Sequence, residues 1–334
     1  MSNSDFCVIL KKMVAVQYAL QIVGMIFQTR SNTITGKDTN HMSQSSFGNK
    51  FKVITWGESH GKALGAVIDG CPAGLPLCEE DIQKFLDRRK PGQSRYTTAR
   101  KEGDLVEILS GVFEGKTTGT PISLMVRNTD QRSRDYGNIA YSYRPGHADY
   151  TFDQKYGFRD YRGGGRSSGR ETIGRVAAGA IASKILEELG ISICTYTRSI
   201  GPVEIASFNK EEIHQNAFYM PDAQAAVKAG EYLEEGMKKQ DSAGGVIECR
   251  ITGTPAGLGE PVFDKLSALL AHALMSIGAV KAVEIGDGIA VTSSNGSTDN
   301  DGFTVKDGEI IKTSNHAGGI MGGISDGSEI ILRA

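Results

Sequence analysis

The sequence lacks several patterns that would assign it at once to a common class of protein. Its 5 cysteines are an odd number without Cys-x-x-Cys spacing, which indicates neither a disulfide framework nor a zinc site and fits a reducing cytoplasm. Its 6 histidines show no His-Glu-x-x-His spacing, so no metal is predicted. No G-x-G-x-x-G follows a first strand and no G-x-x-x-x-G-K-[ST] occurs, so neither a Rossmann site nor a P-loop is indicated.

The chain also has almost no excess charge of either sign. Lysine and arginine number 37 against 39 aspartate and glutamate residues, which gives a net charge of −2 at pH 7. Nucleic-acid-binding domains are usually strongly basic, so no nucleic-acid partner is predicted, and RNA binding by the arginine- and glycine-rich stretch is the weakest alternative. The length of 334 residues allows one large domain or two ordinary ones.

A long hydrophobic run is missing as well. Lys11 and Lys12 precede an apolar stretch from Met13 to Phe27, an order typical of a secretory signal. Two glutamines interrupt this stretch, no small-x-small cleavage site follows, and it is short for a membrane span. We therefore expect residues 1–41 to be an atypical extension, disordered or outside the core, with Met42 as an alternative start and no membrane partner.

The body of the chain alternates between strand and helix patterns. Periodicity and turn residues predict these elements without deciding between an α/β and an α+β protein. The predicted strands cover Phe51–Trp56, Leu64–Ile68, Val106–Phe113, Pro121–Val126, Ile191–Thr197, Gly245–Gly253 and Glu329–Leu332. The predicted helices cover Glu79–Arg89, Arg170–Leu189, an acidic insert at Lys210–Lys239, and Lys265–Ile277 with Asp264 as its cap. The polar, aromatic stretch 128–162 has little periodicity and is predicted to be a functional loop.

The run from Gly163 to Gly169 is the strongest local signal of a ligand site. Three glycines allow backbone N–H groups to approach a ligand, and Ser167 and Ser168 follow where a helix would start. Arg166 and Arg170 flank the two serines, which gives the helix start the character of an anion site. The predicted ligand is a phosphate on a nucleotide, a flavin or a sugar-like acid, although such loops also occur as plain turns.

Arginine and histidine recur around this loop. Arginines are frequent from Arg88 to Arg175, and several lie beside glycine, proline or serine. Arginine binds carboxylate and phosphate through two parallel hydrogen bonds. The alternative interpretation is that these arginines form a solvated basic face without a ligand. His60 follows a strand in a glycine-flanked turn, and His147 lies in a stiff turn near an arginine, so both are candidates for proton transfer or ordinary surface residues. His272 is predicted to be a core residue.

Several motifs, taken in order, resemble those of the chorismate synthase family. They extend over about residues 47–333, and a set of this size is far more specific than a single glycine loop. The matching segments are Gly57–Gly61 with Asp69–Pro72, Arg88–Arg95, Arg144–Asp149, Gly163–Arg170, Asp241–Gly245, Gly257–Asp264 and Asn315–Gly323.

The resemblance implies a lyase that makes chorismate from 5-enolpyruvylshikimate 3-phosphate by 1,4-anti elimination of phosphate. The reaction requires reduced FMN without net redox change, and NADPH serves as a possible reductant of the flavin. The implied fold is α+β, a β-α-β sandwich with helices between antiparallel sheets. The implied assembly is a cytoplasmic homotetramer.

The resemblance also implies roles for individual residues. His60 and His147 match the acid–base pair of the family. The residues that match flavin contacts are Arg166, Ser167, Ser168, Gly278, Ala279 and Gly322, and those that match contacts to NADPH or anionic ligands are Arg89 and Arg95. The residues expected to bind substrate are Ser59, Arg88, Arg89, Arg95, Arg144 and Arg170.

The chain departs from the family pattern at a few places. Lys90 stands where the family often has an arginine, and Cys78 replaces a usual threonine or serine helix cap. The chain stops at Ala334, where the family continues with a Lys-Pro-Thr flavin loop and an Arg-His-Asp-Pro segment. Residues 42–334 are thus expected to form a chorismate synthase domain lacking its C-terminal segment. Two hypotheses about the function follow. In the first the chain is a chorismate synthase, and in the second it is a catalytically inactive relative that binds only phosphate ligands or a full-length partner.

Overall fold

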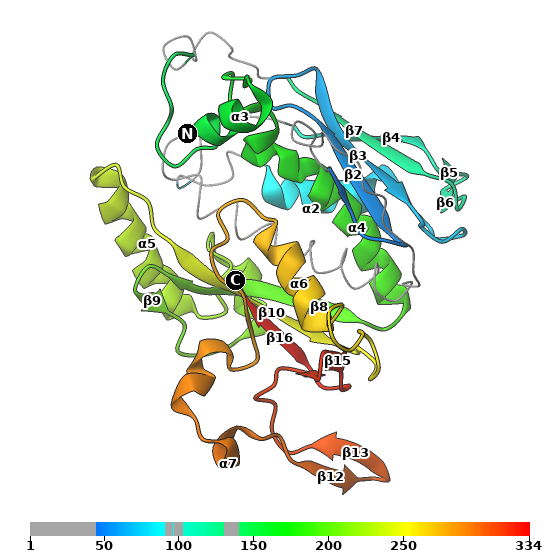
Figure 1. Cartoon of the computed structure of the whole chain (residues 1–334), viewed down its shortest axis with the longest axis vertical. Coiled ribbons are helices and arrows are strands. Elements are labelled where there is room, and N and C mark those ends of the chain that lie inside the picture. The colour runs from blue at the N-terminus through cyan, green and yellow to red at the C-terminus, as the bar shows by residue number, and fades with distance from the viewer. Residues whose placement is uncertain (1–44, 91–95, 97–102, 130–139) are drawn as a thin grey trace. The chain divides into compact units, whose positions relative to one another are not determined.

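A computed structural model describes residues 45–90, 96, 103–129 and 140–334 (Figure 1). These residues form two compact units. The first, here called the N-terminal unit, contains residues 45–90, 103–129 and 140–182. The second, the C-terminal unit, contains residue 96 and residues 183–334. The predicted extension 1–41 and Arg95 lie outside the described residues.

The N-terminal unit is built on a five-stranded antiparallel sheet with the order β1-β2-β3-β7-β4. Its strands are β1 (Ser46–Phe47), β2 (Lys52–Gly57), β3 (Ala63–Asp69), β4 (Val106–Ser110) and β7 (Ile122–Arg127). Along β7 the side chains of Ile122, Leu124 and Val126 are buried while their neighbours are not. This period of two is the pattern that predicted the strands, because alternate side chains point to opposite faces. A small hairpin of β5 (Val112–Phe113) and β6 (Lys116–Thr117) completes the set.

Two long helices accompany this sheet. The helix α2 covers Glu79–Arg89, as predicted, and buries Ile82 and Leu86. The helix α4 covers Thr172–Glu188 and runs beside the sheet in Figure 1. A Cβ on Gly174 would lie 2.7 Å from the carbonyl oxygen of Gly65. Glycine in the helix interior, which is unfavourable on propensity alone, therefore allows α4 to approach β3 closely.

The segment predicted to be one long loop contains a helix. Residues 149–156 form α3 (Asp149–Tyr156), and Gly157 ends it in the left-handed conformation. Two 3-10 turns, η2 (Gly165–Ser167) and η3 (Gly169–Glu171), come before α4. Arg170 therefore lies in a tight turn ahead of the helix that it was predicted to begin.

The C-terminal unit has its own five-stranded antiparallel sheet, with the order β11-β16-β10-β8-β9. Its strands are β8 (Ser192–Ile200), β9 (Val203–Glu204), β10 (Gly245–Thr252), β11 (Glu284–Ile285) and β16 (Ile330–Arg333). Since every described strand pair is antiparallel in both units, the α+β class is confirmed. The placement of helices between the sheets concerns the stacking of the units and stays a prediction.

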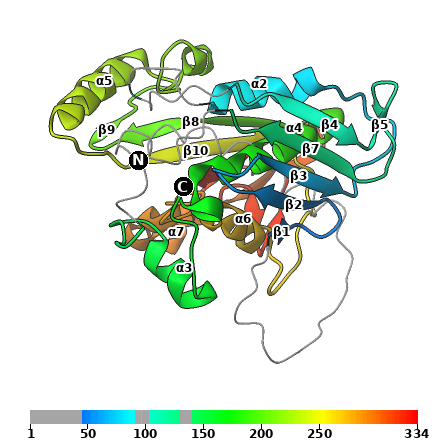
Figure 2. The same cartoon turned by 90° about the horizontal axis from the view of Figure 1, so that it is seen from above.

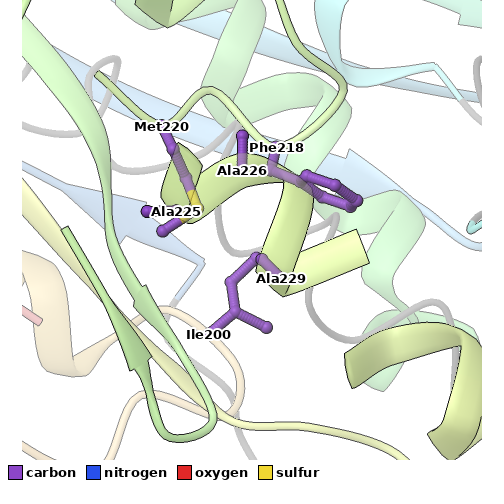
Figure 3. Packing of buried hydrophobic residues seen from close by; sticks show 6 residues of the cluster. All are labelled: Ile200, Phe218, Met220, Ala225, Ala226 and Ala229. Atoms are coloured by element: carbon purple, nitrogen blue, oxygen red, sulfur yellow. The ribbon is translucent and has the colours of Figure 1, made fainter. Parts of the chain in front are cut away.

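The predicted acidic insert is helical. It contains η4 (Lys210–His214) and α5 (Ala223–Lys238), and α5 lies beside β9 in Figure 2. The side chain of Asp222 caps α5 by accepting hydrogen bonds from the backbone of Gln224 and Ala225. The buried face of α5 contributes three alanines to a compact apolar cluster (Figure 3). The cluster consists of Ile200, Phe218, Met220, Ala225, Ala226 and Ala229.

Two predictions about the next helix are wrong. The helix α6 covers Leu266–Met275, and Lys265 rather than Asp264 occupies its N-cap, without a side-chain cap bond. His272, predicted to be a core residue, is exposed, because Leu270, Ala273 and Leu274 form the buried stripe. The remaining elements are η5 (Gly288–Ser293), α7 (Gly296–Asp299) and the hairpins β12 (Phe303–Lys306) with β13 (Glu309–Lys312) and β14 (Ile320–Met321) with β15 (Ile324–Ser325). Among the helices of the described ranges, none combines the length and apolarity needed to cross a bilayer.

Candidate active site

The turn after β2 and the glycine loop before η2 meet in the N-terminal unit. Ser59 and His60 are both buried, and Ser59 Oγ donates a hydrogen bond of 3.4 Å to the carbonyl oxygen of Gly163. A Cβ on Gly163 would lie 2.5 Å from Nε2 of His60. Only glycine allows this backbone to lie against the imidazole ring, and the φ of +68° also favours glycine. The fold thus brings two separate sequence motifs into one place.

A network of polar groups, half-buried at Asn128 and buried at Arg170 and Asp104, supports the turn that carries Ser59 and His60, here called the histidine turn. The amide nitrogen of Asn128 donates to the carbonyl oxygens of Glu58 (3.1 Å) and Gly61 (2.8 Å). Its amide oxygen accepts hydrogen bonds from Nε (3.1 Å) and Nη2 (2.8 Å) of Arg170. Arg170 and Arg89 both pair with Asp104, at 3.1 and 3.0 Å, and the Asp104 side chain is 0% exposed. One buried carboxylate therefore holds two of the predicted ligand-binding arginines.

Arg166 fastens the glycine loop to the sheet. Its guanidinium donates to the carbonyl oxygens of Gly57 (3.2 Å) and Thr55 (3.1 Å) and to the hydroxyl of Thr55 (2.6 Å). The same hydroxyl donates to Glu171 at 2.9 Å. Because Gly57 ends β2 just before the histidine turn, Arg166 ties the loop and that turn to the same strand.

The hydroxyls of the loop stabilise its turns. Ser167 Oγ donates to the carbonyl oxygen of Gly164 at 2.7 Å. Ser168 caps η3 by accepting from the backbone N–H of Arg170 at 3.3 Å. The predicted position of these serines at the start of the long helix is wrong, because two 3-10 turns come first: Ser167 ends η2, Ser168 caps η3, and α4 begins only at Thr172. Their contact with a flavin stays a prediction.

Arg144 and His147 occupy the turn before α3. Arg144 binds Asp149 through two parallel hydrogen bonds, from Nε (2.9 Å) and Nη2 (2.8 Å). The hydrogen bonds from Arg144 lower the pKa of Asp149 to about 2. A Cβ on Gly164 would lie 3.4 Å from Nη2 of Arg144, so the guanidinium faces the glycine loop. His147 is exposed, and desolvation together with the charge of Arg144 lowers the pKa of its imidazole.

The other predicted site residues are distributed over both units. Arg88 is exposed at the end of α2, with its guanidinium 4.6 Å from the ring centre of Phe85. Gly278, Ala279 and Gly322 belong to the C-terminal unit. A Cβ on Gly278 or Gly322 would meet nothing within 4 Å, and Ala279 has a φ of +73°. Gly278 and Gly322 therefore have open space beside their backbone.

Three supporting residues were not predicted from the sequence as parts of the site. Asp149 ends a motif that was recognised for its histidine, and Asn128 begins the segment predicted to be a loop. Asp104 is a single polar residue ahead of a strand, and no local pattern distinguishes it from a surface aspartate. Their importance depends on contacts with residues distant in sequence, which local patterns do not encode.

The fold and this arrangement define an α+β protein whose histidine, arginine and hydroxyl groups suit an anionic small molecule. The chain matches the chorismate synthase family over residues 51–334. A chorismate synthase of Agathobacter rectalis is 66% identical over 295 residues, 88% of this chain and 80% of that protein. The chorismate synthase of Chloroflexus aggregans is 55% identical over 293 residues, 87% of this chain and 80% of that protein.

A solved structure supports the same assignment. The crystal structure of a chorismate synthase matches with a TM-score of 0.73 and 35% identity, covering 85% of this chain and 83% of that one. The chain belongs to the chorismate synthase family and is an enzyme of the lyase class.

Proposed function

We propose that the chain converts 5-enolpyruvylshikimate 3-phosphate into chorismate by 1,4-anti elimination of phosphate, and that it depends on reduced FMN. The observation that carries the proposal is the contact of the His60 turn with the glycine loop in a chain 66% identical to a chorismate synthase. The substrate has a phosphate and two carboxylates, and the surrounding arginines supply matching positive charge.

The residues of the chain fit a flavin phosphate. The guanidinium of Arg144 lies near Gly164, with Nη2 3.4 Å from a Cβ built there. A Cβ built on Gly278 or Gly322 in the C-terminal unit would meet nothing within 4 Å, which leaves room for a ligand. Arg166, Ser167 and Ser168, with Gly278, Ala279 and Gly322, are the residues proposed to hold FMN. When bound there, reduced FMN would supply electron density to the allylic C–O bond that breaks.

The two histidines have different surroundings and suit different proton transfers. His60 is buried against the loop, where its imidazole is proposed to protonate the departing phosphate. The lowered pKa of His147 leaves this imidazole neutral near pH 7, so it suits the acceptance of a proton. Arg144 and Arg170 are proposed to orient the anionic groups of the substrate, together with Ser59, Arg88, Arg89 and Arg95.

An anaerobic assay with reduced FMN and 5-enolpyruvylshikimate 3-phosphate tests the activity. Chorismate and phosphate should form in equal amounts, and His60→Ala should lower turnover by roughly 100-fold or more, because general acid catalysis contributes on this scale. Absence of both products, with phosphate ligands still bound, would identify the chain as an inactive relative. Normal turnover of a folded His60→Ala variant would remove His60 from the mechanism.

The proposal extends to the flavin reductant, the assembly and the location. The resemblance to the family supports NADPH as a possible reductant, with Arg89 and Arg95 as contacts, a homotetramer and a cytoplasmic location. Addition of NADPH to oxidised FMN and protein under anaerobic conditions should bleach the flavin absorbance if the chain reduces its own cofactor. Sedimentation should give four times the chain mass of 35.8 kDa, about 143 kDa, for a closed symmetric tetramer.

A further inference from the structure

Asn128 is half-buried and bridges two parts of the candidate site, the histidine turn and Arg170. We propose that Asn128 is a positioning residue that fixes the turn carrying Ser59 and His60 and couples it to Arg170. The inference rests on the proposed function insofar as His60 is taken to act in the reaction. Asn128 itself is not proposed to touch the substrate.

The orientation of the Asn128 amide follows from the chemistry of its neighbours. Its oxygen faces Arg170, which can only donate, at 3.1 Å from Nε and 2.8 Å from Nη2. Its nitrogen faces the carbonyl oxygens of Glu58 and Gly61, which can only accept, at 3.1 and 2.8 Å. The opposite orientation would oppose donor to donor and acceptor to acceptor. The neighbours therefore determine one rotamer of the amide.

These contacts hold the two ends of the histidine turn together through a side chain that is not part of the turn. The backbone N–H of Gly61 donates to the carbonyl oxygen of Glu58 at 3.0 Å, and Asn128 Nδ2 joins the same two residues a second time. The backbone N–H of Asn128 also donates to the carbonyl oxygen of Lys62 at 3.1 Å. His60 lies inside the segment held at both ends, so the direction of its side chain depends on Asn128.

The network continues from Asn128 to helix α2. Arg170 pairs with Asp104, which also holds Arg89 near the C-terminal end of α2. The Asp104 carboxylate is completely buried, and such a carboxylate fixes both guanidinium groups in place. An anion that binds at these arginines would therefore meet a histidine whose position is set through the same chain of contacts.

The variant Asn128→Asp separates positioning from support of the fold. Aspartate has nearly the same shape and retains the acceptor for Arg170. It loses the donor and places a carboxylate oxygen against two carbonyl oxygens. We expect kcat to fall roughly 100-fold with KM changed by less than about threefold, because small displacements of a catalytic group cost on this order.

The chain contains a matched control in Asn216. Its amide nitrogen likewise donates to two carbonyl oxygens, of Glu212 and Met220, at 2.8 Å each. This turn belongs to the C-terminal unit and carries no predicted site residue. Asn216→Asp should lower the urea midpoint in a comparable way and leave kcat within about twofold, because it makes the same chemical change away from the site. Equal losses of kcat in both variants would overturn the positioning role.

Hydrogen exchange supplies a readout that does not depend on activity. Backbone amides of residues 58–62 should exchange roughly tenfold faster in Asn128→Asp, while those of β7 keep their wild-type protection. Unchanged exchange at 58–62 would overturn the inference even if kcat fell. A wild-type chain without chorismate formation would refute the proposed function, and the exchange measurement would still decide the positioning role.

A second variant covers a failure of Asn128→Asp to fold. Asn128→Ser removes the long amide and leaves a neutral hydroxyl too short to span Arg170 and the turn. The same loss of kcat and the same local rise in exchange are expected. Wild-type kcat in Asn128→Ser would overturn the proposal.

Discussion

Gly163 lies where no other side chain fits beside His60. Its φ is +68°, and a Cβ would lie 2.5 Å from the imidazole. We expect Gly163→Ala to destabilise the protein by about 1–3 kcal/mol through the left-handed backbone and the clash. Turnover should fall roughly 100-fold, because the ring must move to make room. Urea unfolding and the chorismate assay measure the two effects.

Gly157 supplies the control for the backbone contribution. It has a φ of +77° and nothing within 4 Å of a built Cβ. Gly157→Ala should therefore carry the backbone cost of about 1 kcal/mol and retain wild-type turnover. A Gly163→Ala variant that behaves like Gly157→Ala would show that the contact with His60 has no functional consequence.

Single residues also show what could and could not be predicted from the sequence. The glycine run and its serines predicted a glycine-rich loop ahead of a helix, because glycine and hydroxyl residues have local preferences. The contact between Gly163 and His60 could not be predicted from local patterns, since it depends on the packing of two distant segments. The same holds for Asp104, whose two arginine partners come from different elements.

At the scale of secondary-structure elements, Arg166 fastens the glycine loop to strand β2. Arg166 donates three hydrogen bonds to Thr55 and Gly57 on that strand. Arg166→Ala should release the loop and weaken FMN binding by at least roughly tenfold, because charged donors contribute about 1.5–3 kcal/mol each. A flavin titration measures the affinity. Unchanged affinity in a folded variant would separate the loop from flavin binding.

The start of α5 depends on one carboxylate. Asp222 accepts from the backbone N–H groups of Gln224 and Ala225 in the helix and of Ala206 and Ser207 outside it. Asp222→Ala should lower the free energy of unfolding by about 2 kcal/mol or more, because a cap and two further bonds are lost together. Urea unfolding followed by circular dichroism measures this.

The cap of η4 provides the comparison for Asp222. Asn209 accepts a single hydrogen bond, from the backbone of Glu211 at 3.1 Å, and is exposed. Asn209→Ala should cost about 0.5–1 kcal/mol, at the low end for a cap. Equal losses in the two variants would contradict the importance of the bonds that Asp222 makes outside the helix.

Elements differed in how well the sequence predicted them. The bounds of α2 were predicted because acidic residues fill its first turn, arginines its last, and apolar residues its buried face. The helix α3 was missed because its polar sequence has no apolar stripe and its one buried residue is Asp149. The hairpin of β12 and β13 was also missed, although Asp307 and Gly308 form a two-residue turn with positive φ at both positions.

At the scale of the molecule, local patterns predicted the longer strands of the two five-stranded sheets but not how they group. The strand β10 pairs with β8 and with β16, which comes from the end of the chain. This pairing places Glu248 beside Tyr196, Arg198 and Arg333. The family resemblance predicted the α+β class, because a set of motifs in order carries information about the whole fold.

Both units contain buried carboxylates that make the molecule sensitive to acid. In the N-terminal unit the hydrogen bonds from Arg144 lower the pKa of Asp149 to about 2. In the C-terminal unit the backbone N–H groups of Ala225, Ala206 and Ser207 lower the pKa of Asp222 to about 2. Burial alone would raise the pKa of Glu248, but Tyr196 and Arg333 lower it below its ordinary value.

A carboxyl group with a lowered folded-state pKa stabilises the protein above its unfolded pKa of about 4 and loses this contribution as the pH falls toward about 2. The free energy of unfolding should therefore fall between about pH 4 and pH 2, and both units should respond in that window. Fluorescence of the single tryptophan, Trp56 in β2, reports on the N-terminal unit, and circular dichroism reports on both. Asp149→Asn should be less stable than the wild type at pH 7 by on the order of 2 kcal/mol, with the difference vanishing near pH 2. Parallel stability curves for the two proteins across this range would show that the pair of Arg144 and Asp149 does not govern the acid response.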